Sequence, residues 1–126
     1  MEVFKMKITV DADYMQQEFA ALDMNFYTYE GLKALLDYYD EDAEFDPDQI
    51  YADCAEYGDG AGYSLDDLIY DYGDEYPVEK WLEDNGLEEN QFNKDQYIKS
   101  LVKRLEEKQE RTVLHIKNGN YIVFND

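Results

Sequence analysis

The sequence predicts a small α+β domain, in which an N-terminal strand and a C-terminal hairpin form a small antiparallel sheet with several short acidic helices packed on one face. Three observations predict it. Residues 2–10 alternate between apolar and polar side chains, which is typical of a half-buried strand. Residues 111–124 contain two apolar runs around Asn118-Gly119, and helix start and stop signals recur between these two ends. At 126 residues, one domain covering residues 1–126 is expected.

The expected strands are amphipathic, and the register of the hairpin stays open. The first strand would place on one face Phe4, Met6, Ile8 and Val10. A two-residue hairpin turn would place on one face Leu114, Ile116, Tyr121 and Val123. A three-residue turn would instead place together Leu114, Ile116, Ile122 and Phe124. Because both faces keep apolar residues in either register, the second face is expected to be partly covered or to form the contact of a homodimer.

Three helices are expected in the first half of the chain. Thr28 can cap the second, because its hydroxyl oxygen can accept a hydrogen bond from a free N–H group of the first turn. Asp46 can cap the third, Pro47 suits its first position, and Gly58 would end it. The expected buried stripes are Met15, Phe19 and Leu22 in the first helix, Tyr29, Leu32, Leu35, Leu36 and Tyr39 in the second, and Ile50, Cys54 and Tyr57 in the third.

Three further helices are expected before the hairpin. Ser64 can cap the fourth and Gly73 would end it. Pro77 opens the fifth, Asn85-Gly86 closes it, and Asn93 can cap the sixth and longest helix. The expected buried stripes are Leu65, Leu68, Ile69 and Tyr72 in the fourth helix, Val78, Trp81 and Leu82 in the fifth, and Tyr97, Ile98, Leu101, Val102 and Leu105 in the sixth.

Negative charge is the strongest feature of the composition. The formal net charge is −20, whereas a small domain stays soluble with a magnitude of roughly 2–8. Residues 11–79 hold 21 carboxylates and a single base, Lys33, together with 11 of the 13 tyrosines. Disorder is not expected, because 44% of the residues are hydrophobic and 16% are aromatic. Residues 94–111 hold six bases against four acids, so the negative field belongs to the central helices.

The acids outside the apolar stripes are expected to be exposed and to bind a positively charged partner. An acidic surface repels nucleic acid and anionic lipid, so the expected partner is a basic protein and neither DNA, RNA nor a membrane. Tyrosine rings among the acids can add cation–π contacts, and aromatic residues are enriched at interfaces. The candidate partner-binding residues are Asp37, Tyr38, Asp40, Asp42, Asp53, Glu56, Asp66, Asp67, Tyr70, Asp71 and Asp74.

Catalysis and metal binding find little support. Cys54 falls on an apolar stripe and is expected to be a buried thiol, while the single histidine, His115, lies within an expected strand. Residues 40–46 alternate acids like the first half of a calcium loop, but Phe45 and Tyr51 stand where that loop needs glycine and glutamate. No enzymatic activity, cofactor or metal is therefore expected. A metal-dependent enzyme or a calcium-binding module is the third hypothesis, after the two given below in which the protein binds a basic partner.

The expected compartment follows from what the sequence lacks. A single cysteine cannot form an internal disulfide. The N-terminus has no apolar run typical of a signal peptide, and no stretch approaches the roughly 18 apolar residues of a membrane span. We therefore expect a soluble cytoplasmic protein.

Size and charge together match a segment of duplex DNA. A chain of this length has a radius of gyration of about 14 Å, so a folded globule is roughly 35 Å across. Duplex DNA carries about twenty phosphate charges in ~34 Å of its axis. The protein therefore holds about the charge of a duplex segment of its own length, as a nucleic-acid mimic would require.

Two acidic, tyrosine-rich segments, Leu-Asp-Tyr-Tyr-Asp-Glu-Asp and Leu-Ile-Tyr-Asp-Tyr-Gly-Asp-Glu, and the closing Asn-Gly-Asn-Tyr-Ile-Val hairpin resemble small phage and mobile-element proteins. Several such proteins are DNA-mimicking inhibitors of host defence, of the anti-CRISPR and anti-restriction kind. The resemblance implies a non-enzymatic inhibitor that occupies the basic groove of a CRISPR effector or restriction enzyme in the host cytoplasm. The alternative is an acidic antidote that neutralises a basic toxin or nuclease through a local patch, without imitating DNA.

Overall fold

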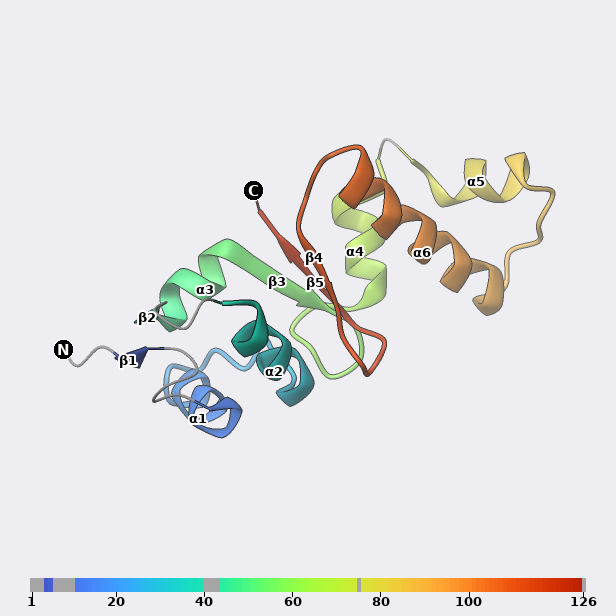
Figure 1. Ribbon diagram of the computed structural model, residues 1–126. Helices are drawn as coiled ribbons and strands as arrows, with labels where there is room; N and C mark the ends of the chain where they lie inside the picture. The colour runs from blue at the N-terminus through green and yellow to red at the C-terminus, as the bar shows by residue number, and fades with distance from the viewer. Residues whose placement is uncertain (1–3, 6–10, 40–43, 75, 126) are drawn as a thin grey trace.

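Six helices and five strands make up the part of the chain that the computed structural model describes, which is residues 4–5, 11–39, 44–74 and 76–125 (Figure 1). The helices are α1 (Ala12–Ala21), α2 (Tyr29–Tyr38), α3 (Pro47–Asp53), α4 (Leu65–Tyr72), α5 (Val78–Asp84) and α6 (Gln91–Glu107). The strands are β1 (Phe4–Lys5), β2 (Glu44–Phe45), β3 (Cys54–Tyr57), β4 (Val113–His115) and β5 (Tyr121–Phe124). The predicted α+β class is confirmed.

The C-terminal hairpin adopts the three-residue register. Leu114 lies opposite Ile122, and His115 lies opposite Tyr121. Residues 117–119 form the loop, which is closed by a hydrogen bond from the Ile116 N–H group to the Asn120 carbonyl oxygen at 2.9 Å. Gly119 has a φ of +91°, a conformation that suits glycine at a hairpin turn.

The third strand of the sheet is β3, in the order β3-β5-β4, and not the N-terminal strand as predicted. The described part of that strand, β1, pairs with β2 instead. The rest of the strand predicted over residues 2–10 lies outside the described residues. The predicted third helix was also too long: α3 ends at Asp53, and the four residues that follow pair with β5. Ile50, Cys54 and Tyr57 fit a helical stripe by spacing, but pairing with β5 decides the outcome.

Helices cover both faces of the three-stranded sheet (Figure 1). The sequence predicted helices on one face and left two alternatives for the other, partial cover or a homodimer contact. The first core cluster joins α1, α2 and α3 to the sheet face that bears Ile122 and Phe124. The second joins α4 and α6 to the face that bears Val113 and Val123. The second apolar face of the hairpin is thus buried by the chain's own helices.

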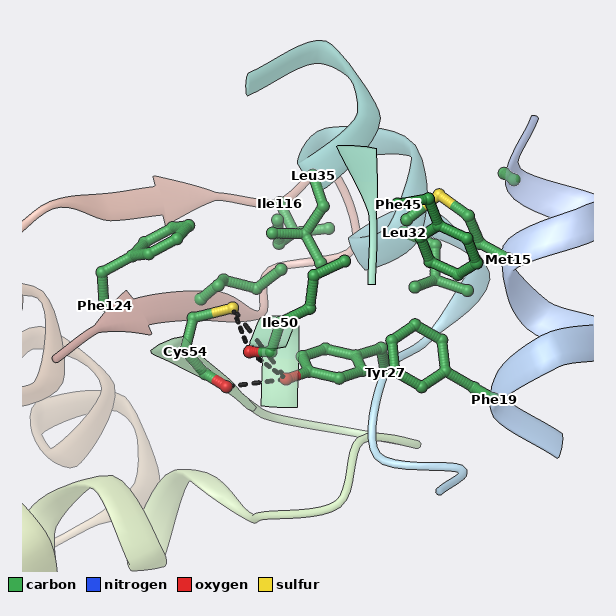
Figure 2. Close-up of a cluster of buried hydrophobic side chains, with 12 residues drawn as sticks. Met15, Phe19, Tyr27, Leu32, Leu35, Phe45, Ile50, Cys54, Ile116 and Phe124 are labelled. Carbon is green, nitrogen blue, oxygen red and sulfur yellow. Dashed lines mark hydrogen bonds between the residues drawn. The ribbon is translucent and has the colours of Figure 1, made fainter. Parts of the chain in front are cut away.

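The first cluster is built around Tyr27, which comes from the loop before α2 (Figure 2). Its hydroxyl donates to the Cys54 carbonyl oxygen at 2.7 Å, and its ring lies 5.2 Å from that of Phe19 on α1. Cys54 itself is 1% exposed, so the predicted buried thiol is confirmed. Burial raises the pKa of this thiol to about 12, which keeps it protonated and unreactive near neutral pH.

Ionisation of buried groups at high pH is expected to destabilise the fold. Burial raises the pKa of Cys54 from 9.0 and that of Tyr97 from 10.0, each to about 12. Unfolding lets both groups ionise at their ordinary values, so their contribution is intact below pH 9.0 and is lost as the pH rises toward 12. The free energy of unfolding, measured in urea at a series of pH values, should fall as the pH rises. The fall should be less steep in Cys54→Ala, because one of the two groups is absent. A stability that stays constant up to about pH 11 would contradict it.

Most helix starts agree with the prediction. Thr28, Asp46 and Ser64 cap α2, α3 and α4 through side-chain oxygens that accept from first-turn N–H groups. The sixth helix starts earlier than predicted, because Asn90 is its cap and accepts from the Asn93 N–H group at 2.8 Å. Its predicted stripe is buried throughout, whereas two residues predicted to face inward are exposed: Leu22 and Tyr29.

Candidate functional site: the acidic surface of α4

Helix α4 presents the most concentrated group of candidate residues. Ser64 caps it, and the Asp67 carboxylate accepts from the Ser64 N–H group in return, which completes a capping box. Leu68 is fully buried against the second core cluster and fixes which side of the helix faces solvent. The side of the helix turned away from the core exposes Asp66, Asp67, Tyr70 and Asp71. Asp74, the residue after Gly73, is exposed as well. We call these five residues the α4 surface.

The α4 surface holds charge at a density close to that of a nucleic-acid strand. Residues three and four positions apart are neighbours on a helix, so Tyr70 lies beside Asp66 and Asp67. Three carboxylates from Asp66 to Asp71 occupy about 8 Å of the helix axis. This spacing is similar to that of the phosphates in one DNA strand, which follow one another every ~3.4 Å. Tyr70 is 82% exposed among the carboxylates, and it offers a free ring face to a partner.

Neighbouring groups hold two of these carboxylates in place. Lys94 of α6 forms an ion pair with Asp66, which offsets part of the charge at the start of the helix. The Tyr57 hydroxyl donates to Asp71 at 2.8 Å. Burial and this acceptor both raise the pKa of Tyr57, so the phenol keeps its proton and remains a donor near neutral pH.

The predicted residues on α2 and α3 lie apart from the α4 surface. Asp37 and Tyr38 end α2, and the Tyr38 ring packs on Phe124 with its centroid 4.8 Å away. Asp53 ends α3 and is half-buried instead of exposed, with its carboxylate accepting from Gln49. Because α2 and α4 cover opposite faces of the sheet, the structure does not gather all candidates on one acidic face as predicted.

Glu56 is not a surface residue, and this corrects a second prediction. It is 0% exposed, because it belongs to β3 and its side chain points to the same side as that of Cys54. Its carboxylate accepts from the Thr28 N–H group at 2.9 Å, from the Thr28 hydroxyl at 2.7 Å and from the Asn120 amide at 2.7 Å. Glu56 therefore joins the start of α2 to the hairpin and cannot contact a partner. Asp40 and Asp42 lie outside the described residues.

Two acids that the sequence did not single out, Asp59 and Asp95, lie next to the α4 surface. A cleft of about 730 Å³ beside the start of α4 is lined by three acids, two lysines and one exposed ring, those of Asp59, Asp66, Asp95, Lys94, Lys99 and Phe92. Asp59 comes from a loop and Asp95 from the helix that was expected to be near neutral to basic. No local pattern indicated that either would lie next to α4. The packing of α6 against α4 places Asp95 there, and two hydrogen bonds with Asn120 hold the backbone of Asp59.

His115 is exposed, and its ring nitrogen lies 3.2 Å from the carboxylate of Glu106. Within the described ranges, no group of three or more His, Cys, Asp or Glu side chains is arranged to hold a metal ion. In the same part of the chain, none of the helices combines the length and apolar character needed to cross a bilayer.

Comparisons with protein-family models, with curated protein sequences and with solved structures gave no match for this chain.

Proposed function

We propose that the protein is a non-enzymatic inhibitor that mimics nucleic acid and occupies the basic groove of a host defence nuclease, either a CRISPR effector or a restriction enzyme. The observation that carries the proposal is the α4 surface. Its exposed carboxylates are spaced about as closely as the phosphates of a DNA strand, and they lie around Tyr70, which is 82% exposed. The net charge of −20 supports the same conclusion, because it exceeds what solubility requires.

The chemistry of such a groove fits the α4 surface. Lysine and arginine side chains that normally contact phosphates would pair with Asp67, Asp71 and Asp74, and the encounter would be accelerated by long-range attraction. The Tyr70 ring can stack against an arginine, which adds a contact that screening by salt weakens less. Such binding excludes DNA from the groove without any chemical step.

An acidic antidote against a basic toxin or nuclease is the second candidate. The separation of α2 and α3 from α4 favours it, since the α4 surface then acts as one local patch instead of a continuous charged face. An antidote of this kind would bind a basic active site but would not compete with DNA along a groove.

DNA cleavage by purified CRISPR effectors and restriction enzymes tests the proposal directly. In low salt, an excess of the protein is expected to stop cleavage by its target, and added salt should restore cleavage as the attraction is screened. Cleavage at the same rate by every enzyme in the presence of a large excess of the protein would contradict the proposal. Inhibition of an enzyme that still holds its DNA would support the antidote instead.

A further inference from the structure

A second feature lies at the outer edge of the sheet, next to α4. Strand β3 is an edge strand that runs from the end of α3 toward the loop before α4 (Figure 1). A cavity of about 370 Å³ opens along it, within the size range of small-ligand sites. Its walls include five aromatic rings and one carboxylate, those of Phe26, Tyr27, Tyr51, Tyr57, Tyr63 and Asp71. We call this cavity the tyrosine pocket.

Four rings of the tyrosine pocket form two tilted pairs. Tyr57 and Tyr63 have centroids 5.4 Å apart with an angle of 33° between the rings. Phe26 and Tyr51 have centroids 5.1 Å apart with an angle of 31°. Tyr51 is 44% exposed and Tyr63 is half-buried, so ring surface at this site remains open to solvent.

Asp71 gives the pocket its charge. It is exposed on α4, and the Tyr57 hydroxyl holds its carboxylate at the pocket through a 2.8 Å hydrogen bond. Burial raises the pKa of both Tyr57 and Tyr63, so their hydroxyl groups stay neutral near physiological pH. The pocket therefore combines neutral aromatic rings with one fixed negative charge.

Aromatic faces beside a carboxylate select a cation, because the negative face of each ring attracts positive charge and the carboxylate accepts its N–H groups. A guanidinium fits this arrangement better than an ammonium, since it is planar, weakly hydrated and able to stack while donating hydrogen bonds in its plane. Among the described residues, the chain's own cation–π contacts use other rings, those of Tyr29, Tyr72 and Tyr76.

We propose that the tyrosine pocket takes an arginine side chain of the basic partner, with the guanidinium stacked on the rings and its N–H groups directed to Asp71. Asp71 belongs to both the pocket and the α4 surface, so one docked partner would engage the two together. The identity of the partner rests on the proposed function, whereas binding of a guanidinium group does not.

Titration of the isolated protein with N-acetyl-arginine amide, followed by NMR, tests the inference without any nuclease. Saturable shifts are expected for the ring protons of Tyr51 and Tyr63. The citrulline analogue has nearly the same shape without the charge, and it should produce no saturable shift. Equal binding of the citrulline analogue would overturn the inference, and tighter binding of the lysine analogue would overturn the choice of guanidinium.

Variants locate the site. Asp71→Asn keeps the side-chain size and should weaken arginine binding about 10-fold, the loss typical of a charge-assisted hydrogen bond. Tyr51→Leu removes a partly exposed ring, so it should weaken binding with the fold preserved. Glu83→Gln on α5 removes the same charge away from the pocket and should leave binding unchanged. Unchanged binding in both pocket variants would overturn the inference.

The two proposals fail separately. If the protein blocks a nuclease but arginine causes no saturable shift in the pocket, the pocket inference is wrong and the proposed function stands. If arginine binds in the pocket but no nuclease is inhibited, the proposed function is wrong and the pocket remains a cation site.

Discussion

Replacing Glu56 with alanine is expected to lower the free energy of unfolding by about 3–5 kcal/mol. The carboxylate is fully buried and accepts hydrogen bonds from Thr28 and from Asn120. Alanine would leave the Thr28 N–H group and the Asn120 amide buried without this acceptor, and it would open a cavity among them. The unpaired donors and the cavity each lower the stability of the folded state, and all of them arise at the same site.

Loss of the Glu56 carboxylate would destabilise the contacts between several segments at once. Asn120 also exchanges two hydrogen bonds with the backbone of Asp59, so the Glu56 group ties α2, β3 and the loop after β3 to the hairpin. Gly31 shows how closely α2 approaches, because a Cβ atom there would lie 1.9 Å from Glu56 Oε1. Glu56 therefore holds the start of α2 against the sheet, while Leu32 and Leu35 pack the helix into the first core cluster.

Chemical unfolding in urea measures the effect. Glu83→Ala, an exposed helix position, is the matched control and should change the stability by less than ~0.5 kcal/mol. Glu56→Gln keeps the shape and one acceptor oxygen, so its loss should be intermediate, at about 1–3 kcal/mol. The account of Glu56 is wrong if Glu56→Ala unfolds at the same urea concentration as the control.

Neutralising the α4 surface is expected to weaken binding to the target by about 100-fold. The variant replaces four acids with asparagine, at positions Asp66, Asp67, Asp71 and Asp74. Asparagine keeps the side-chain size and an acceptor oxygen, so the capping box at Ser64 retains an acceptor and the fold should persist. Single replacements of Asp66, Asp67 or Asp74 should each have a small effect, because exposed ion pairs contribute little individually.

A second quadruple variant separates the position of the charges from their number. It replaces four exposed acids near and on α5 and α6 with glutamine, at Glu79, Glu83, Glu88 and Glu107. Both variants remove the same charge, so only the α4 variant should lose affinity and show a shallower salt dependence. Equal losses in the two dissociation constants would show that net charge, and not the α4 surface, governs binding.

Local signals predicted much of the fold. Thr28, Asp46 and Ser64 cap their helices as expected, because capping depends on atoms only two or three residues away. Strand β3 was missed, since the residues from Ile50 to Tyr57 also fit a helical stripe and only the distant β5 makes the strand. The misplacement of Glu56 followed from this error, because a strand directs its side chain inward where a helix would have exposed it.

The candidate site divides in the same way. Exposure of Asp66, Asp67, Tyr70 and Asp71 follows from the period of one helix and was predicted from the sequence. The separation of α2 from α4 depends on which sheet face each helix covers, and a helical period carries no information about that choice. The tyrosine pocket likewise needs rings from segments far apart in the chain, so no spacing could have indicated it.

Competition between the protein and DNA for the same nuclease distinguishes a nucleic-acid mimic from an antidote. A labelled duplex bound to a nuclease that the protein inhibits would be titrated with the protein, and bound DNA would be followed by fluorescence anisotropy. A nucleic-acid mimic should displace the DNA completely, and the protein concentration required should rise in proportion to the DNA concentration. The α4 variant should be about 100-fold weaker as a competitor. A stable complex that holds the nuclease, the DNA and the protein together would contradict nucleic-acid mimicry.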